Sequence, residues 1–137
     1  VRTLRTALHF GLNGGADAKT IAVTSPSPGD GKSTVASNLA IAMAQADQRV
    51  LLIDADLRKP TQHLIFEIDA TRGLGSVLSD RGPVQDAIQP SGVPSLDILP
   101  CGPLPSNPVE LLNNGFFADL LEELNNRPMR ANIAISF

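Results

Sequence analysis

Two short apolar runs flank a helical pattern near the start of the chain. Residues 19–25, KTIAVTS, form a short β-rich run and are predicted to be a buried strand. Residues 48–56, QRVLLIDAD, are too continuously apolar for a solvent-facing strand, so they are also predicted to be buried. Residues 32–46 between them place apolar side chains at helical spacing, are rich in Ala and contain no Gly or Pro. The order strand, helix, strand is typical of a βαβ unit and predicts a parallel sheet.

The rest of the chain continues this alternation. Further helices are expected at residues 1–10, 73–80, 83–89, 107–115 and 116–127, and a further strand at residues 95–100. The helix at 107–115 carries its own end signals, since Asn107 can cap it, Pro108 suits its first position, Glu110 can reach back and Gly115 can close it. We expect a single α/β domain over residues 1–137, with no internal repeat or domain boundary.

Composition narrows the function classes. The chain has 137 residues, 42% of them hydrophobic, a net charge of −3 and a pI near 5.2, which argues against nucleic-acid binding through bulk charge. Its single cysteine, Cys101, allows no internal disulfide and fits a reducing compartment. No apolar run approaches the roughly 18 residues of a membrane span.

The segment SPSPGDGKST, residues 25–34, follows the first predicted strand and opens the helix, which is the arrangement of a phosphate-binding loop. Its backbone N–H groups and the helix N-terminus can surround phosphate oxygens. Lys32 can reach the β- and γ-phosphates, Ser33 can bind Mg²⁺ and Thr34 can contact the α-phosphate. The residues expected to bind nucleotide are Pro28, Gly29, Asp30, Gly31, Lys32, Ser33 and Thr34.

One position departs from the strict loop pattern, because Pro26 stands where a glycine would be expected. The alternative is a proline-rich turn that happens to precede a lysine. The strand before it and the helix after it favour the phosphate-binding interpretation.

Two carboxylates follow the second strand. Asp54 and Asp56 lie two residues apart, so in a strand both would point the same way, at the edge where parallel sheets bind ligands. A divalent cation would relieve their repulsion. The alternative is a solvated acidic turn paired with Arg58 and Lys59.

These segments resemble the bacterial tyrosine kinases of capsule and exopolysaccharide synthesis. The matching stretches are RTLRTAL, VTSPSPGDGKSTVASNLA, RVLLIDADLRKP, GLGSVL and LPCGPLPSNPVELL. The resemblance implies a P-loop NTPase-like, three-layer α/β/α fold with a mostly parallel sheet that is incomplete at its C-terminus. It also implies ATP or ADP and Mg²⁺ as cofactors, and tyrosine phosphorylation between neighbouring subunits.

The resemblance also implies roles and partners. Lys32 would act on the phosphates, Asp54 would assist the attacking hydroxyl or hold a metal-bound water, and Asp56 would support the metal beside Ser33. Arg2 and Arg5 match a subunit-contact helix, so copies of the chain are expected partners, although a solvated helix face is the simpler interpretation. A transmembrane polysaccharide co-polymerase or adaptor segment would hold the domain at the cytoplasmic face of the plasma membrane, and nucleic acid is not expected as a partner.

The chain departs from this family near its end. The family has a hydrophobic strand ending in aspartate, called Walker B, whereas NIAISF would form a strand with Ser136 near that position. The glutamate of the family's subunit-contact helix would lie before Val1, and the family's tyrosine-rich tail is absent from a sequence that contains no Tyr. Both ends therefore look cut. We therefore expect nucleotide binding with weak or no kinase activity, because transfer depends on charges around the metal.

Two other functions remain open at this point. An ATPase of the partitioning and division-site type would have a second lysine in the loop, where this chain has Ser27. A nucleotide-responsive interaction module without enzymatic activity is the third possibility. His9, His63 and Cys101 are expected to be surface, packing or loop residues, since no metal-ligand spacing or adjacent base accompanies them.

Overall fold

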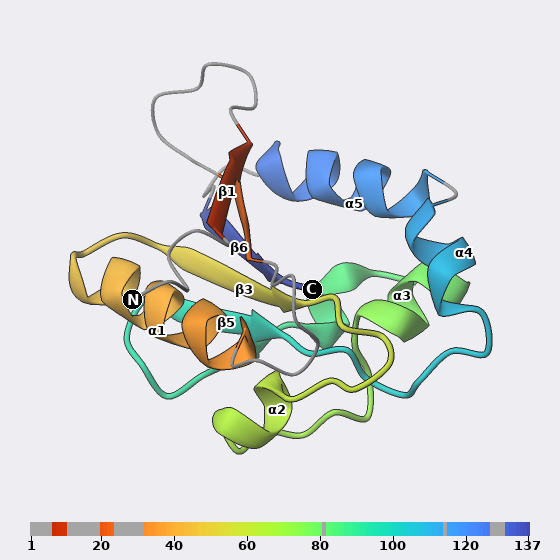
Figure 1. Ribbon diagram of the computed structural model, residues 1–137, viewed down its shortest axis with the longest axis horizontal. Coiled ribbons are helices and arrows are strands. Elements are labelled where there is room, and N and C mark those ends of the chain that lie inside the picture. The colour runs from red at the N-terminus through yellow and green to blue at the C-terminus, as the bar shows by residue number, and fades with distance from the viewer. Residues whose placement is uncertain (1–6, 11–19, 24–31, 81, 114, 127–130) are drawn as a thin grey trace.

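The computed structural model describes residues 7–10, 20–23, 32–80, 82–113, 115–126 and 131–137. They form a six-stranded sheet in the order β1-β2-β6-β3-β5-β4 (Figure 1). The strands are β1 Ala7–Phe10, β2 Thr20–Val23, β3 Val50–Asp54, β4 Gln89–Pro90, β5 Leu96–Leu99 and β6 Asn132–Ser136. The four inner strands run parallel, whereas β1 and β4 pair antiparallel at the two edges. The sheet is therefore mostly parallel, as predicted.

Helices cover both faces of this sheet. They are α1 Lys32–Gln45, α2 Gln62–Ile65, α3 Leu74–Asp80, the 3₁₀ helix η2 Val84–Ala87, α4 Pro108–Asn113 and α5 Phe116–Asn125. Figure 1 shows α1 and α2 on one side of the sheet and α3, α4 and α5 on the other. This arrangement confirms the predicted three-layer α/β/α architecture.

The packing on both sides of β3 explains why its first four residues are all apolar. Leu52 packs with α1 residues in one buried cluster, whereas Leu51 and Ile53 pack in the cluster beneath α3, α4 and α5. Successive strand side chains point to opposite faces, so a strand with helices on both sides has apolar residues at successive positions. All five residues of β3 are buried, which confirms the expected buried strand.

The strand predicted at NIAISF docks in the middle of the sheet. β6 lies between β2 and β3 and is parallel to both. Ile133 and Ile135 face the α5 side and Ala134 faces α1, and all three are at most 1% exposed. Burial on both faces and pairing on both edges hold this segment in place.

The helix predicted over residues 1–10 is wrong for its second half. Ala7–Phe10 is β1, with Ala7 in register with Val23 and Phe10 with Thr20. Residues 1–6, including Arg2 and Arg5, lie outside the described residues. Pairing satisfies the backbone groups on one edge of β2, and this outweighs a weak helical periodicity.

The region predicted as a helix at 83–89 is shorter and tighter than expected. A 3₁₀ turn covers Val84–Ala87, and Gln89 already belongs to β4. Pro83 and Ile88 on either side have extended backbone angles. α2 was not predicted, because four residues are too few to show a helical period.

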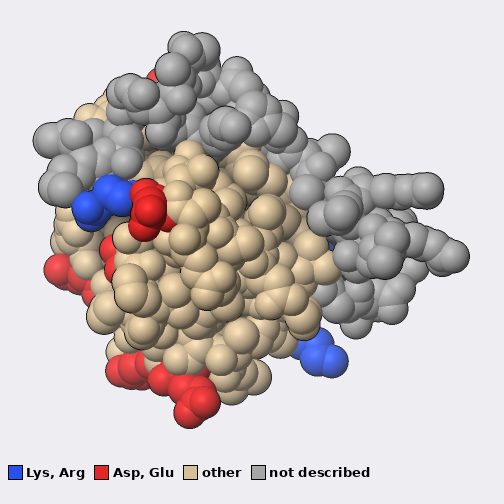
Figure 2. Space-filling model, turned by 90° about the vertical axis from the view of Figure 1, so that its left-hand side faces the viewer, with Lys and Arg blue, Asp and Glu red and all other residues tan. Residues whose placement is uncertain are grey.

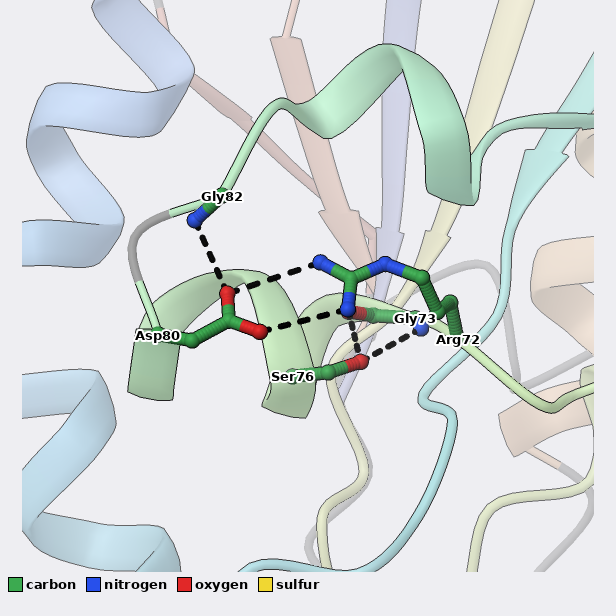
Figure 3. Close-up of polar contacts among 5 residues, drawn as sticks. All are labelled: Arg72, Gly73, Ser76, Asp80 and Gly82. Atoms are coloured by element: carbon green, nitrogen blue, oxygen red, sulfur yellow. Dashed lines mark hydrogen bonds and ion pairs between the residues drawn. The ribbon is translucent and has the colours of Figure 1, made fainter.

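A network of polar contacts organises the start and end of α3 (Figure 3). The Ser76 hydroxyl accepts the Gly73 N–H at 2.9 Å and donates to the Gly73 carbonyl at 3.0 Å. Arg72 pairs with Asp80 at 3.2 Å, and Asp80 also accepts the Gly82 N–H at 2.8 Å. The turns at both ends of α3 are thereby tied to each other.

The loop after β5 crosses the start of α3 at very close range. A Cβ on Gly73 would lie 2.3 Å from the Gly102 nitrogen and 2.3 Å from the Pro100 oxygen. The Leu74 N–H donates to that Pro100 oxygen at 2.8 Å, and the Gly75 N–H to the Cys101 oxygen at 2.9 Å. Only glycine permits this backbone contact, which explains the GLG and CG sequences.

Candidate nucleotide-binding site

Three strand ends meet where the sequence predicts the ligand. Val23, Ser136 and Asp54 are in register at the carboxyl ends of β2, β6 and β3. Alternation places Ser136 and Asp54 on the same face as Ala134 and Leu52, which is the face covered by α1. The carboxyl edge of a parallel sheet is where α/β proteins bind ligands.

Asp54 is a buried carboxylate held by backbone amides. It is 1% exposed. Its Oδ2 accepts the N–H groups of Thr61 at 3.1 Å and Gln62 at 3.0 Å, and its Oδ1 accepts that of Asp56 at 3.1 Å. Burial raises the pKa of Asp54 above its usual value, although these three amide bonds lower it, and the nearby Asp56 charge raises it further. A cation beside Asp54 would therefore stabilise its charged form.

Asp56 lies two residues beyond the end of β3, so the predicted strand over residues 48–56 is too long and strand alternation does not place the Asp56 carboxylate. β3 ends at Asp54. The Asp56 carboxylate is half-buried and accepts the N–H groups of Arg58 at 3.2 Å and Lys59 at 3.0 Å, which closes a turn. The two acids still lie close enough for the Asp56 charge to raise the pKa of Asp54. The alternative of a solvated acidic turn is wrong for Asp54, which is buried.

Ser136 occupies the strand end where the family resemblance implies an aspartate. It is fully buried and in register with Asp54. Its carbonyl accepts the Ala55 N–H at 2.7 Å, and its hydroxyl accepts the Gln62 Nε2–H at 3.3 Å. A neutral hydroxyl therefore stands beside the Asp54 carboxylate, as the sequence predicted.

Gln62 is a functional candidate that the sequence did not indicate. It is fully buried, its backbone N–H donates to Asp54, and its Nε2 donates to the Ser33 carbonyl at 2.9 Å as well as to Ser136. Its Oε1 is buried without a hydrogen-bond partner among the described residues. A residue of the short, unpredicted α2 carries no periodicity signal, so only the tertiary structure brings it to the site.

The described part of the phosphate-binding segment is the first turn of α1. Lys32 begins that helix, Ser33 is half-buried and Thr34 is exposed, and the Ser37 hydroxyl donates to the Thr34 carbonyl at 2.9 Å. Nothing is described of the Lys32 side chain. The predicted loop residues Pro28, Gly29, Asp30 and Gly31 lie outside the described residues, as does Pro26.

The donors in this region suit magnesium. Mg²⁺ takes one or two protein carboxylates and completes its shell with water and phosphate oxygens. Asp54 supplies a buried carboxylate, and burial disfavours its charged form. Gln62, which donates to that carboxylate through its backbone, has a side-chain oxygen with no hydrogen-bond partner among the described residues. Within the described ranges no group of three or more His, Cys, Asp or Glu could by itself hold a metal. The residues thus fit a metal that arrives with a nucleotide, with Ser33, Asp54 and Asp56 as the candidate ligands.

Cys101 and His63 show no sign of a chemical role among the described residues. Cys101 is fully buried, and burial followed by the charges of Asp54 and Asp56 raises the pKa of its thiol to about 12. A thiol with so high a pKa is a poor nucleophile. His63 is half-buried in α2, and nothing is described of the His9 side chain.

A separate hollow lies at the other ends of the strands. Its volume is about 730 Å³, and its walls include Val50 at the start of β3, Leu124 of α5 and Ile133 of β6. The hollow contains none of the predicted site residues, so it does not compete with the carboxyl edge of the sheet as the nucleotide site.

Figure 2 shows one face of the molecule, on which the described charged side chains lie mainly around the rim of an uncharged centre.

Comparison with protein families and curated relatives gives a consistent assignment. The family described as "AAA domain" matches residues 18–123. Tyrosine-protein kinase YwqD of Bacillus subtilis is 46% identical over 122 residues, which are 89% of this chain and 51% of that protein. Tyrosine-protein kinase ptk of Acinetobacter johnsonii is 39% identical over 93% of this chain and 17% of its own length. The chain thus spans about half or less of these two relatives.

Solved structures give the same family. The chimerical protein CapA2B2 has a TM-score of 0.77 at 42% identity, covering 88% of this chain and 53% of that one. The kinase domain of Escherichia coli tyrosine kinase ETK has a TM-score of 0.77 at 34% identity, covering 87% and 47%. The septum site-determining protein MinD of Pyrococcus horikoshii, complexed with Mg-ADP, has a TM-score of 0.70 at 26% identity, covering 84% and 46%. The chain belongs to the AAA domain family, and within that family its sequence and fold are similar to those of bacterial tyrosine kinases.

Proposed function

We propose that this chain is the ATP- and Mg²⁺-binding domain of a bacterial tyrosine kinase that regulates exopolysaccharide or capsule synthesis and export. The observation that carries the proposal is the register of Asp54 with Ser136 beside the first turn of α1. Bound Mg²⁺ would neutralise the phosphates of the nucleotide. Asp54 would hold this ion or its water, with Asp56 supporting it, while Ser33 and Lys32 contact the nucleotide.

We further propose that phosphoryl transfer by this chain is weak or absent. Positioning and charge around the metal supply most of the rate in such reactions, and Ser136 contributes no charge. The sequence contains no Tyr, so a substrate tyrosine would lie outside these 137 residues. Self-association through Arg2 and Arg5 and attachment to a membrane co-polymerase at the cytoplasmic face belong to this proposal. None of the described helices has the length and apolarity needed to cross a bilayer.

Isothermal titration calorimetry with Mg·ADP and Mg·ATP tests nucleotide binding. The folded wild-type protein should bind both, and Lys32→Ala should weaken both, because the ammonium group is lost. A folded wild-type protein that binds neither nucleotide would overturn the proposal. A parallel assay with a tyrosine-rich peptide should show little transfer, and robust transfer would contradict the second part.

A partitioning-type ATPase remains the second candidate, because the MinD structures share the fold. Ser27 replaces the lysine expected in that class, which favours the kinase. Nucleotide-dependent dimerisation on DNA would favour the ATPase. A nucleotide-responsive interaction module without enzymatic activity is the third candidate. Its partner binding should be lost in Lys32→Ala, and partner binding that survives this change would show that the interaction does not need nucleotide.

A further inference from the structure

We propose that Gln62 is a positioning residue that couples Mg²⁺ binding to the first turn of α1. The inference rests on the proposed nucleotide binding but concerns a residue outside the phosphate-binding segment and the two acids. The inference is based on the contacts of Gln62, whose backbone and buried side chain together reach β3, α1 and β6 at the candidate nucleotide site.

The three contacts of Gln62 join parts of the chain that are far apart in sequence. Its backbone N–H donates to Asp54 Oδ2 at 3.0 Å, which orients that carboxylate. Its Nε2 donates to the Ser33 carbonyl at 2.9 Å, which fixes the first turn of α1. The same Nε2 donates to Ser136 Oγ at 3.3 Å, at the end of β6. A displacement of Gln62 would therefore shift Ser33 relative to Asp54.

The amide orientation follows from these partners. Nε2 faces the Ser33 carbonyl, which can only accept, so a flipped amide would set two oxygens against each other. Oε1 is consequently the atom left without a partner among the described residues. A buried unpaired acceptor is unfavourable and calls for an explanation.

A water in the shell of a nucleotide-bound Mg²⁺ would supply that missing donor. Magnesium keeps several of its waters in proteins, and these waters donate hydrogen bonds. We infer that Gln62 acts in two ways: Nε2 holds Ser33 in place, and Oε1 receives a metal-bound water. Both effects strengthen nucleotide binding only when Mg²⁺ is present.

The test compares ADP affinity in Mg²⁺ and in EDTA by calorimetry, for wild type, Gln62→Met and Asn132→Leu. Methionine has a similar length and no donor, so the Mg²⁺-dependent gain in affinity should fall by about fivefold or more. Asn132 is the matched control, because its buried amide ties the opposite end of β6 to Gln48 at 3.3 Å and to Arg49 at 3.2 Å. Asn132→Leu should lower stability and leave the Mg²⁺-dependent gain within about twofold of wild type.

The outcomes separate this inference from the proposed function. Wild-type protein that binds no ADP overturns both. Suppose instead that the wild-type protein binds ADP and that Mg²⁺ raises the ADP affinity of Gln62→Met as much as that of wild type. That result overturns only the role of Gln62 and leaves the proposed function standing. If Gln62→Met does not fold, Gln62→Asn gives the same comparison, because its amide is one methylene too short to reach Ser33.

Hydrogen exchange provides a second readout. In wild type, Mg·ADP should slow amide exchange in the first two turns of α1 and in α2 together. In Gln62→Met, Mg·ADP should still slow amide exchange in the first two turns of α1 but should slow it less in α2. Equal protection of both segments in the variant would contradict the coupling.

Discussion

Asp54 and Ser136 end two adjacent parallel strands in register, both buried and on the face covered by α1. One carries a carboxylate and the other a neutral hydroxyl. The first two predictions follow from this pair, because the balance of charge between the strand ends decides how strongly a metal is held.

Ser136→Asp should make the domain dependent on Mg²⁺. A second buried carboxylate beside Asp54 should lower the free energy of unfolding by about 3 kcal/mol in EDTA. Mg·ADP should recover much of that loss and bind at least about tenfold more tightly than to wild type, because two carboxylates then share the cation. Chemical denaturation and calorimetry measure the two effects.

Ser136→Asn serves as the neutral control of similar size. It should change stability without creating Mg²⁺ dependence. The prediction fails if the aspartate and asparagine variants respond alike to Mg²⁺.

Asp54→Asn should change how stability depends on pH. Burial raises the pKa of Asp54, so the folded protein holds this proton more tightly than the unfolded chain does. The resulting stabilisation is complete below the unfolded pKa near 3.8 and is lost as pH rises through the folded pKa. The unfolding free energy of Asp54→Asn relative to wild type should therefore increase with pH across that window.

Urea denaturation of both proteins in the absence of Mg²⁺, at several pH values from 4 upward, measures this slope. Asp97→Asn, at an exposed position of β5, is the control and should follow wild type more closely. Parallel pH profiles for wild type and Asp54→Asn would show that burial does not raise this pKa.

Gly73→Ala should destabilise the domain more than Gly92→Ala. The new Cβ at residue 73 would meet backbone atoms of residues 100–102 at 2.3–2.4 Å, and neither backbone segment can move freely. The expected loss is about 2–4 kcal/mol. Gly92 has a φ of +93°, and a Cβ at that position would have nothing within 4 Å, so alanine there should cost about 1–2 kcal/mol from backbone strain alone. Denaturation curves that rank the two variants in the opposite order would refute the close crossing.

The Cys101 thiol should be nearly inert in the folded protein. Burial raises its pKa to about 12, so at pH 8 the thiolate fraction is about three orders of magnitude below that of a free cysteine. Mass spectrometry should show that iodoacetamide labels the native protein about a thousandfold more slowly than the urea-unfolded chain. Native labelling within tenfold of the unfolded rate would contradict the burial of this side chain.

The sequence by itself determined the elements whose patterns are local. The buried strands β2, β3 and β5 and the helices α1, α3, α4 and α5 follow from apolar runs, helical spacing and end signals along the chain. Asp54 could be singled out because it closes an apolar run, although the predicted strand continued to Asp56. Ser136 was singled out by the resemblance to the kinase family, which has an aspartate near that position.

The tertiary structure decided what depends on contacts between distant segments. Ala7–Phe10 is a strand because it pairs with the edge of β2. Asp56 falls outside the alternation of β3 because that strand ends at Asp54. Gln62 reaches Ser33 and Ser136, 29 and 74 residues away, from a four-residue helix with no period to detect. The local sequence pattern predicts which face of a strand or helix a side chain lies on. Hydrogen bonds between distant segments depend instead on how the layers pack, and no single segment of the sequence contains that information.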